Sequence, residues 1–120
     1  IAIAESGSGG KFANMLLGES DAGDVMLGAL ALAPGAGSAA ELAAMAAERF
    51  GAKIGLGITA TVDSVANGLH EGPVVVALTG AVSTEETFPL KAAYPEVQRR
   101  AAMHAADVLR RAILTSDDAR

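Results

Sequence analysis

Residues 1–17 read IAIAESGSGGKFANMLL. The opening segment, Ile1 to Glu5, is typical of a short strand, and Lys11 to Leu17 carries apolar residues at helical spacing. Between them lies Gly7-Ser8-Gly9-Gly10, which we call the glycine turn. The sequence therefore predicts a strand, a tight turn and a helix in immediate succession.

The rest of the chain continues this alternation. We expect strands and helices, in chain order, at Val25–Ala33, Ala39–Phe50 (helix), Ile54–Thr61, Pro73–Leu78, Val82–Lys91 and from Tyr94 onward (helix). Val25–Ala33 is apolar throughout, like a strand buried on both faces. The alternation in Val82–Lys91 indicates an edge strand with Glu85 and Glu86 in water. This order predicts an α/β fold, a three-layer α/β/α sandwich with one mixed sheet, as a single domain over residues 1–120.

Local signals fix several details of these elements. Ser38 and Glu41 form a capping box for the central helix, and Gly51 ends it. Gly55 and Gly57 indicate close approach of a neighbouring element to their strand. We expect inward-facing side chains at Leu42, Met45, Ala46 and Phe50 in that helix, and at Val97, Ala101, Ala105, Val108 and Leu109 in the last one. We expect a turn at Asp21–Asp24, a polar loop at Val62–Gly72 and a frayed tail at Asp117–Arg120.

Composition excludes several classes of function. The chain has no cysteine, which removes disulfides, thiolate nucleophiles and Cys-based zinc sites. Its net charge of −5 and the lack of a basic run disfavour nucleic-acid binding. Glycines and Pro34 interrupt the longest apolar stretch, so no membrane span is expected. Half of the chain is apolar, mostly as small side chains, and we expect a cytoplasmic homo-oligomer that covers surplus apolar surface with a second copy.

The glycine turn is the strongest candidate for chemistry. A turn between a strand and a helix presents backbone N–H groups and a helix dipole that favour an anion. The hydroxyl of Ser6 or Ser8 could bind a phosphate or act as a nucleophile. Lys11 stands where a phosphate-binding loop would have its lysine, but Glu5 and Phe12 break that motif. A structural turn with a helix cap is the competing interpretation.

Ala4–Gly10 reads Ala-Glu-Ser-Gly-Ser-Gly-Gly. This segment and three others resemble the CinA C-terminal family, the nicotinamide-nucleotide amidohydrolases. Ala4–Gly10 is similar to the family signature Ala-Glu-Ser-Cys-Thr-Gly-Gly, with Gly7 and Ser8 in place of Cys and Thr. Gly51–Thr59 and Gly72–Leu78 resemble two family strands, and Val97–Arg111 resembles its last helix. Only the first motif is specific, although together the segments cover most of the chain.

The resemblance implies a metal-independent enzyme that deamidates nicotinamide mononucleotide to nicotinate mononucleotide and ammonia. The family nucleophile maps onto Ser6 as the catalytic residue. The residues expected to bind the small-molecule nucleotide are Glu5, Ser8, Gly9, Gly10, Lys11, Thr59 and Arg99. No cofactor and no metal ligand are implied.

The sequence departs from the family pattern after the second strand. The family has a Tyr-Ser-Asn-Glu-Ala-Lys segment there, whose Tyr and Lys assist the serine, whereas this chain passes from Ala33 through Pro34–Gly37 to the next helix. Gln98 also replaces a family arginine in the last helix. The alternative is therefore a catalytically silent paralogue that acts as a nucleotide-binding or oligomerising module. Lys11 and Arg99 then lie on solvated helix faces, and Tyr94 packs at the helix start.

Overall fold

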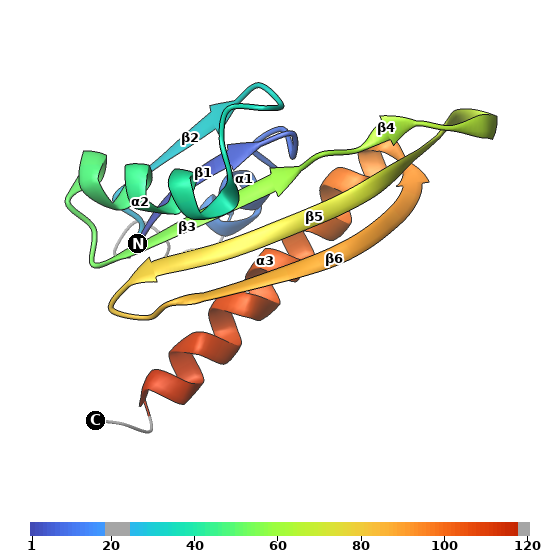
Figure 1. The fold of residues 1–120 in the computed structure, drawn as a ribbon. Helices are drawn as coiled ribbons and strands as arrows, with labels where there is room; N and C mark the ends of the chain where they lie inside the picture. The colour runs from blue at the N-terminus through green and yellow to red at the C-terminus, as the bar shows by residue number, and fades with distance from the viewer. Residues whose placement is uncertain (19–24, 118–120) are drawn as a thin grey trace.

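A computed structural model of the chain describes residues 1–18 and 25–117. Figure 1 shows a single sheet with helices on both of its faces. The elements in chain order are β1 (Ala2–Ser6), α1 (Lys11–Leu17), β2 (Gly28–Leu32), α2 (Ala39–Phe50), β3 (Ile54–Ala60), β4 (Asp63–Ser64), a single 3-10 turn (Ala66–Gly68), β5 (Leu69–Gly80), β6 (Thr84–Ala93) and α3 (Tyr94–Asp117). The predicted α/β class is confirmed, and so is the order of elements, except that the two-residue β4 and the 3-10 turn lie where a loop was expected.

The sheet is mixed, as the sequence predicts. Its strand order is β2-β1-β3-β5-β4, with β6 paired to β5. β1 is parallel to both β2 and β3, whereas β5 is antiparallel to β3, β4 and β6. Three parallel strands therefore end at the same edge, with β1 in the middle.

The alternation of side chains in β1 separates the two faces of the sheet. Ala2 and Ala4 are buried in one cluster with Leu42 of α2. Ile3 is buried in the other, larger cluster, which includes Phe12 of α1 and Val97 of α3. Because successive strand residues point to opposite faces, α2 covers one face and α1 with α3 the other, which completes the three layers.

α2 packs very closely against the sheet. A Cβ atom added at Gly57 would lie 2.0 Å from the carbonyl oxygen of Ala39. A Cβ atom added at Gly55 would likewise lie 2.0 Å from the carbonyl oxygen of Ala43. The close approach expected from these glycines is therefore confirmed. The capping box of Ser38 and Glu41 is present, with the Glu41 amide 3.1 Å from the Ser38 hydroxyl. These hydrogen bonds also lower the pKa of the Glu41 carboxyl.

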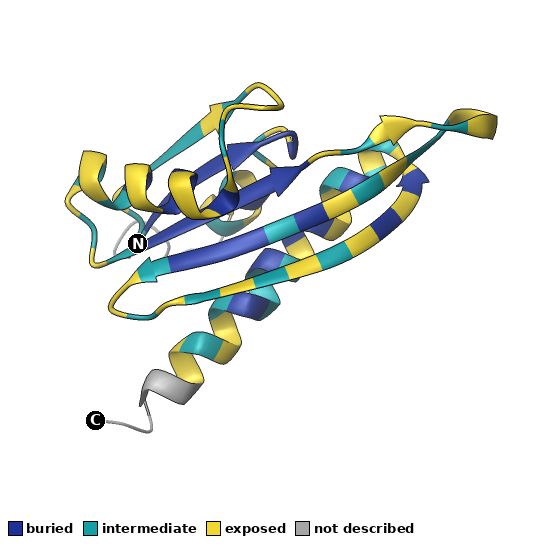
Figure 2. Cartoon of the chain, in the orientation of Figure 1, coloured by how far each residue is buried: buried dark blue, intermediate teal, exposed yellow. Residues whose placement is uncertain are grey.

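The long helix α3 lies across the face opposite α2. Its buried stripe consists of Val97, Ala101, Ala102, Ala105 and Val108, while Leu109 is half-buried. Figure 2 shows burial concentrated where α3 crosses the sheet, and exposure increasing toward its C-terminal end, which extends past the strands. Exposed Ile113 and Leu114 lie on that last part.

Three expectations about individual strands and side chains are wrong. The strand expected at Val25–Ala33 is shorter, and Val25 is 55 % exposed. β2 lies at the edge of the described sheet, and its residues are half-buried or exposed instead of buried on both faces. Met45 is 37 % exposed, and the inward positions of α2 are filled by Leu42 together with Ala39, Ala43 and Ala46. The expected polar loop Val62–Gly72 is shortened, because β5 already begins at Leu69.

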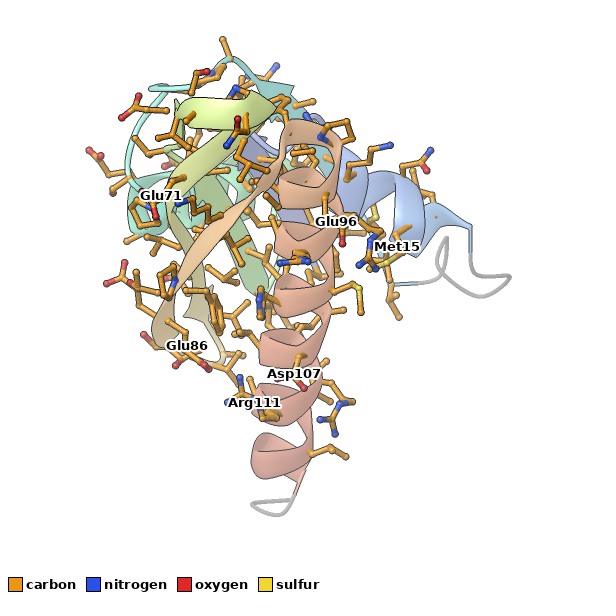
Figure 3. The ribbon with its side chains drawn as sticks, turned by 90° about the vertical axis from the view of Figure 1, so that its right-hand side faces the viewer. Met15, Glu71, Glu86, Glu96, Asp107 and Arg111 are labelled. Carbon is orange, nitrogen blue, oxygen red and sulfur yellow. The ribbon has the colours of Figure 1, made fainter. Side chains whose placement is uncertain are left out.

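Glu86 requires a fourth correction. It lies on β6, an edge strand as predicted, but its carboxylate binds Arg111 of α3 at 2.8 Å instead of facing water alone. Figure 3 shows Glu86 on the strand, with Arg111 and Asp107 on the adjacent helix. Asp107 binds the same arginine at 2.9 Å. The Glu86–Arg111 pair joins the exposed half of α3 to the sheet.

Two expectations lie outside the residues whose structure is described. These are the turn at Asp21–Asp24 and the tail beyond Asp117. Within the described residues, no helix has the length and hydropathy to cross a membrane.

Candidate functional site

The candidate site lies where the parallel strands end. Ser6, the last residue of β1, is in register with Leu32 of β2 and Thr59 of β3. In open α/β sheets, ligands commonly bind beyond the carboxyl ends of parallel strands. The structure thus brings two predicted site residues, Ser6 and Thr59, side by side, although they are far apart in sequence.

The Ser6 side chain is almost fully buried, with 2 % of its surface exposed. Its hydroxyl donates a hydrogen bond to the carbonyl oxygen of Ala33 at 2.7 Å, and the Ala36 amide lies 3.5 Å from the same oxygen. Both partners belong to the short connection that follows β2. Among the described residues, no carboxylate, imidazole or amine is hydrogen-bonded to Ser6.

Glu5 is completely buried on the opposite face of the sheet. Its carboxylate accepts the hydroxyl of Ser8 at 2.6 Å, and the amides of Phe12 and Ala13 at 3.1 and 2.8 Å. These amides belong to the first turn of α1, whose N-cap is Gly10 and therefore has no side chain to bind them. Glu5 takes the part of a capping residue, and the positive end of the helix stabilises its charge.

The glycine turn requires its glycines. Gly7 has φ of 84°, and a Cβ there would lie 2.4 Å from the carbonyl oxygen of Ala60 at the end of β3. Gly9 has φ of 68°, and a Cβ there would lie 2.7 Å from the side-chain nitrogen of Gln98. The glycine turn is thus wedged between the end of β3 and the beginning of α3.

Two α3 residues at the glycine turn were not predicted as site residues. The hydroxyl of Tyr94 donates to the carbonyl oxygen of Gly7 at 2.9 Å, so Tyr94 does more than pack at the helix start. One helical turn later, the Gln98 carboxamide lies against Gly9. The Tyr94 ring also contacts His70, whose buried Nδ1 has no hydrogen-bond partner among the described residues. The separation of 87 positions between Tyr94 and Gly7 explains why sequence spacing gave no signal.

The two predicted cationic residues, Lys11 and Arg99, are both exposed. The Arg99 guanidinium donates to the Glu96 carboxylate at 2.9 Å, and Arg100 donates to the same group at 3.1 Å. These bonds, first that from Arg99 and then that from Arg100, lower the pKa of Glu96 to about 2. The Arg99 side chain is therefore hydrogen-bonded within its own helix.

Two hollows lie away from the glycine turn. One, of about 430 Å³, lies over the β5–β6 pair and is lined by residues such as Pro73, Pro89 and Leu90. The other, of about 300 Å³, is an apolar groove between α1 and α3 that Met15 and Leu109 help to line. No group of three or more acidic or histidine side chains within the described ranges is placed to hold a metal ion.

The architecture and the site define a class: an α/β/α domain whose candidate site is a glycine turn at the carboxyl edge of three parallel strands. The sequence matches no protein-family model. It matches no curated protein either.

Solved structures are nevertheless similar to the chain. The CinA superfamily protein from Enterobacter cloacae has 19 % identity and a TM-score of 0.74, over 89 % of this chain and 78 % of that one. The CinA superfamily protein from Escherichia coli has 22 % identity and a TM-score of 0.73, over 89 % and 77 %. The competence/damage-inducible protein CihA from Agrobacterium tumefaciens has 18 % identity and a TM-score of 0.67, over 89 % and 81 %. The chain has the fold of the CinA superfamily.

Proposed function

We propose that this chain is a CinA-like domain that binds a nicotinamide-type ligand at the glycine turn and does not hydrolyse it. The observation that carries this proposal is the hydrogen bond from the Ser6 hydroxyl to the Ala33 carbonyl oxygen, at 2.7 Å. A serine becomes a nucleophile when a neighbouring base accepts its proton, and a peptide carbonyl is not such a base.

Ser8 is no better placed as a nucleophile. Its side chain is fully buried, and its hydroxyl donates to Glu5. That carboxylate also accepts two backbone amides of α1, so Ser8 belongs to a buried structural network. Both hydroxyls near the glycine turn thus hold the backbone in place.

The second candidate is deamidation of nicotinamide mononucleotide with Ser6 as the nucleophile. The observation that favours it is the position of Ser6 at the carboxyl end of β1, directly before the glycine turn. In that reaction the Ser6 oxygen attacks the carboxamide carbon, the C–N bond breaks, and ammonia leaves with the proton. Water then releases the acid from the serine.

Ammonia release and ligand binding separate the two candidates. We expect purified protein to bind nicotinamide riboside or nicotinamide mononucleotide, followed by calorimetry, without releasing ammonia from either. Ammonia release that Ser6→Ala abolishes and Ser83→Ala, at an exposed serine, leaves intact would establish the hydrolase instead. If neither ligand binds and no ammonia appears, both candidates are excluded.

Self-association remains part of the proposal, as does a cytoplasmic location. The apolar groove between α1 and α3 and the exposed side chains of Met15, Met103 and Ile113 support a second copy as the partner. Light scattering after size exclusion should give a mass above that of one chain. Ile113→Asp should reduce that mass to the monomer, whereas Met45→Asp, an exposed residue on α2, should not change it. A monomeric wild-type protein would exclude self-association.

A further inference from the structure

The backbone amides in the first turn of α1 are not available to bind an anionic ligand. An isolated helix start leaves its first backbone amides without partners, and these are the groups that bind phosphate. In this protein these amides are already hydrogen-bonded to other groups of the chain. The pairs are Lys11 N with Ser8 O (3.3 Å), Phe12 N with Glu5 Oε1 (3.1 Å), Ala13 N with Glu5 Oε2 (2.8 Å) and Asn14 N with Gly10 O (3.0 Å).

The charge around the glycine turn also opposes an anion. Glu5 is fully buried directly beneath it, where water does not screen its negative charge. Lys11 is exposed, so solvent weakens its attraction for a ligand. Arg99 and Arg100 are both bound to Glu96. A phosphate at the glycine turn would meet a buried carboxylate, while Arg99 and Arg100 are already paired with Glu96.

Gln98 offers a different kind of contact. Its side chain is half-buried, and the carboxamide lies so close to Gly9 that only glycine fits below it. Within the described part of the chain, this carboxamide makes no hydrogen bond to the protein. It therefore presents two N–H donors and one acceptor oxygen beside the glycine turn, a set suited to a hydroxyl or an amide.

We propose that the glycine turn selects an uncharged hydrogen-bonding group over a phosphate ester, with Gln98 as the residue that contacts it. The inference deepens the proposed function, on which it rests. Of two otherwise identical nicotinamide ligands, the nucleoside is then preferred over its 5′-phosphate.

The test compares nicotinamide riboside with nicotinamide mononucleotide by calorimetry at low and moderate salt. The wild-type protein should bind the riboside at least about tenfold more tightly. Gln98→Leu, which keeps the size but loses the hydrogen bonds, should weaken riboside binding about tenfold. Gln98→Arg should raise the affinity for the mononucleotide about tenfold. Met45→Arg adds the same charge at an exposed position of α2, on the opposite face of the sheet, and should leave both affinities unchanged.

The possible results separate this inference from the proposed function. Tighter binding of the mononucleotide by wild-type protein, or riboside binding unaffected by Gln98→Leu, overturns the inference and leaves the proposed function standing. Failure of both ligands to bind overturns both. Thermal unfolding of each variant shows whether a loss of binding reflects a loss of fold. If Gln98→Leu does not fold, the Gln98→Arg result and the wild-type preference decide the question.

Discussion

The hydroxyl of Tyr94 lies 2.9 Å from the carbonyl oxygen of Gly7, to which it donates a hydrogen bond. This bond links the first residue of α3 to the turn that begins the candidate site. Ser6 precedes Gly7 directly, so the position of α3 also bears on the backbone around Ser6. The bond makes Tyr94 a positioning residue for the glycine turn.

Replacing Tyr94 by phenylalanine should destabilise the protein by about 1 kcal/mol, because the variant loses one partly buried hydrogen bond and keeps the ring. Urea unfolding measures the change. Tyr94→Leu should cost more, since it also removes the ring contact with His70, whose centroid lies 5.1 Å away. Equal stability of the wild type and Tyr94→Phe would show that the hydrogen bond contributes nothing.

Replacing Glu5 by glutamine should have a larger effect. The glutamine side chain has one acceptor oxygen where the carboxylate has two, so its carboxamide NH2 donor would face the N–H donor of Phe12 or Ala13 in a fully buried site. We expect a loss of about 2–4 kcal/mol in the free energy of unfolding, measured in urea.

Two further variants serve as controls for Glu5→Gln. Ser8→Ala removes only one of the three bonds to Glu5 and should cost about half as much. Glu85→Gln changes an exposed carboxylate on β6 and should lie within about 0.5 kcal/mol of the wild type. A Glu5→Gln protein as stable as Glu85→Gln would disprove the capping role of Glu5.

Adding a methyl group at Gly57 should damage the packing of α2. Its Cβ would lie 2.0 Å from the Ala39 carbonyl oxygen, so α2 has to move away from the sheet. We expect a cost above about 3 kcal/mol. Gly51→Ala provides the contrast, because that glycine has φ of 63° and no atom near its added Cβ. It should cost only about 1 kcal/mol of backbone strain. Similar costs in the two variants would contradict the steric explanation.

The sequence predicted those parts of the fold that depend on short-range patterns. Helix α2 illustrates this, because Ser38 and Glu41 lie three residues apart and Gly51 ends the same helix. The close approach at Gly55 and Gly57 was likewise encoded by residue type. What could not be predicted was the place of β2 at the edge of the sheet, because apolar content alone does not say how many neighbours a strand has.

The candidate site was predicted only in part, for the same reason. Ser6 and the glycine turn are adjacent in sequence, so their association was visible from the start. The capping role of Glu5 depends on the direction in which its side chain leaves β1, and residue type alone does not give that direction. Tyr94 and Gln98 reach the glycine turn only because α3 crosses the sheet from the far end of the chain.

The ion pairs of Glu96 predict a pH dependence of stability. Arg99 and Arg100 lower the pKa of Glu96 to about 2 in the folded protein, from the ordinary 4.5 of a glutamate. Because the folded pKa is the lower one, ionised Glu96 stabilises the fold above about pH 4.5, and this contribution is lost as the pH falls toward 2. The effect is small, since the side chains are well exposed and solvent screens them.

We expect the melting temperature of wild-type protein to fall by about 1–3 °C more than that of Glu96→Gln between pH 5 and pH 2. Asp107, whose pKa is lowered first by Arg110 and then by Arg111, titrates in both proteins and so cancels in the comparison. Calorimetry at each pH gives the difference, which 0.5 M salt should reduce because the pairs are screened. Glu85→Gln should follow the wild type. If Glu96→Gln follows it as well, the two arginines do not stabilise the start of α3.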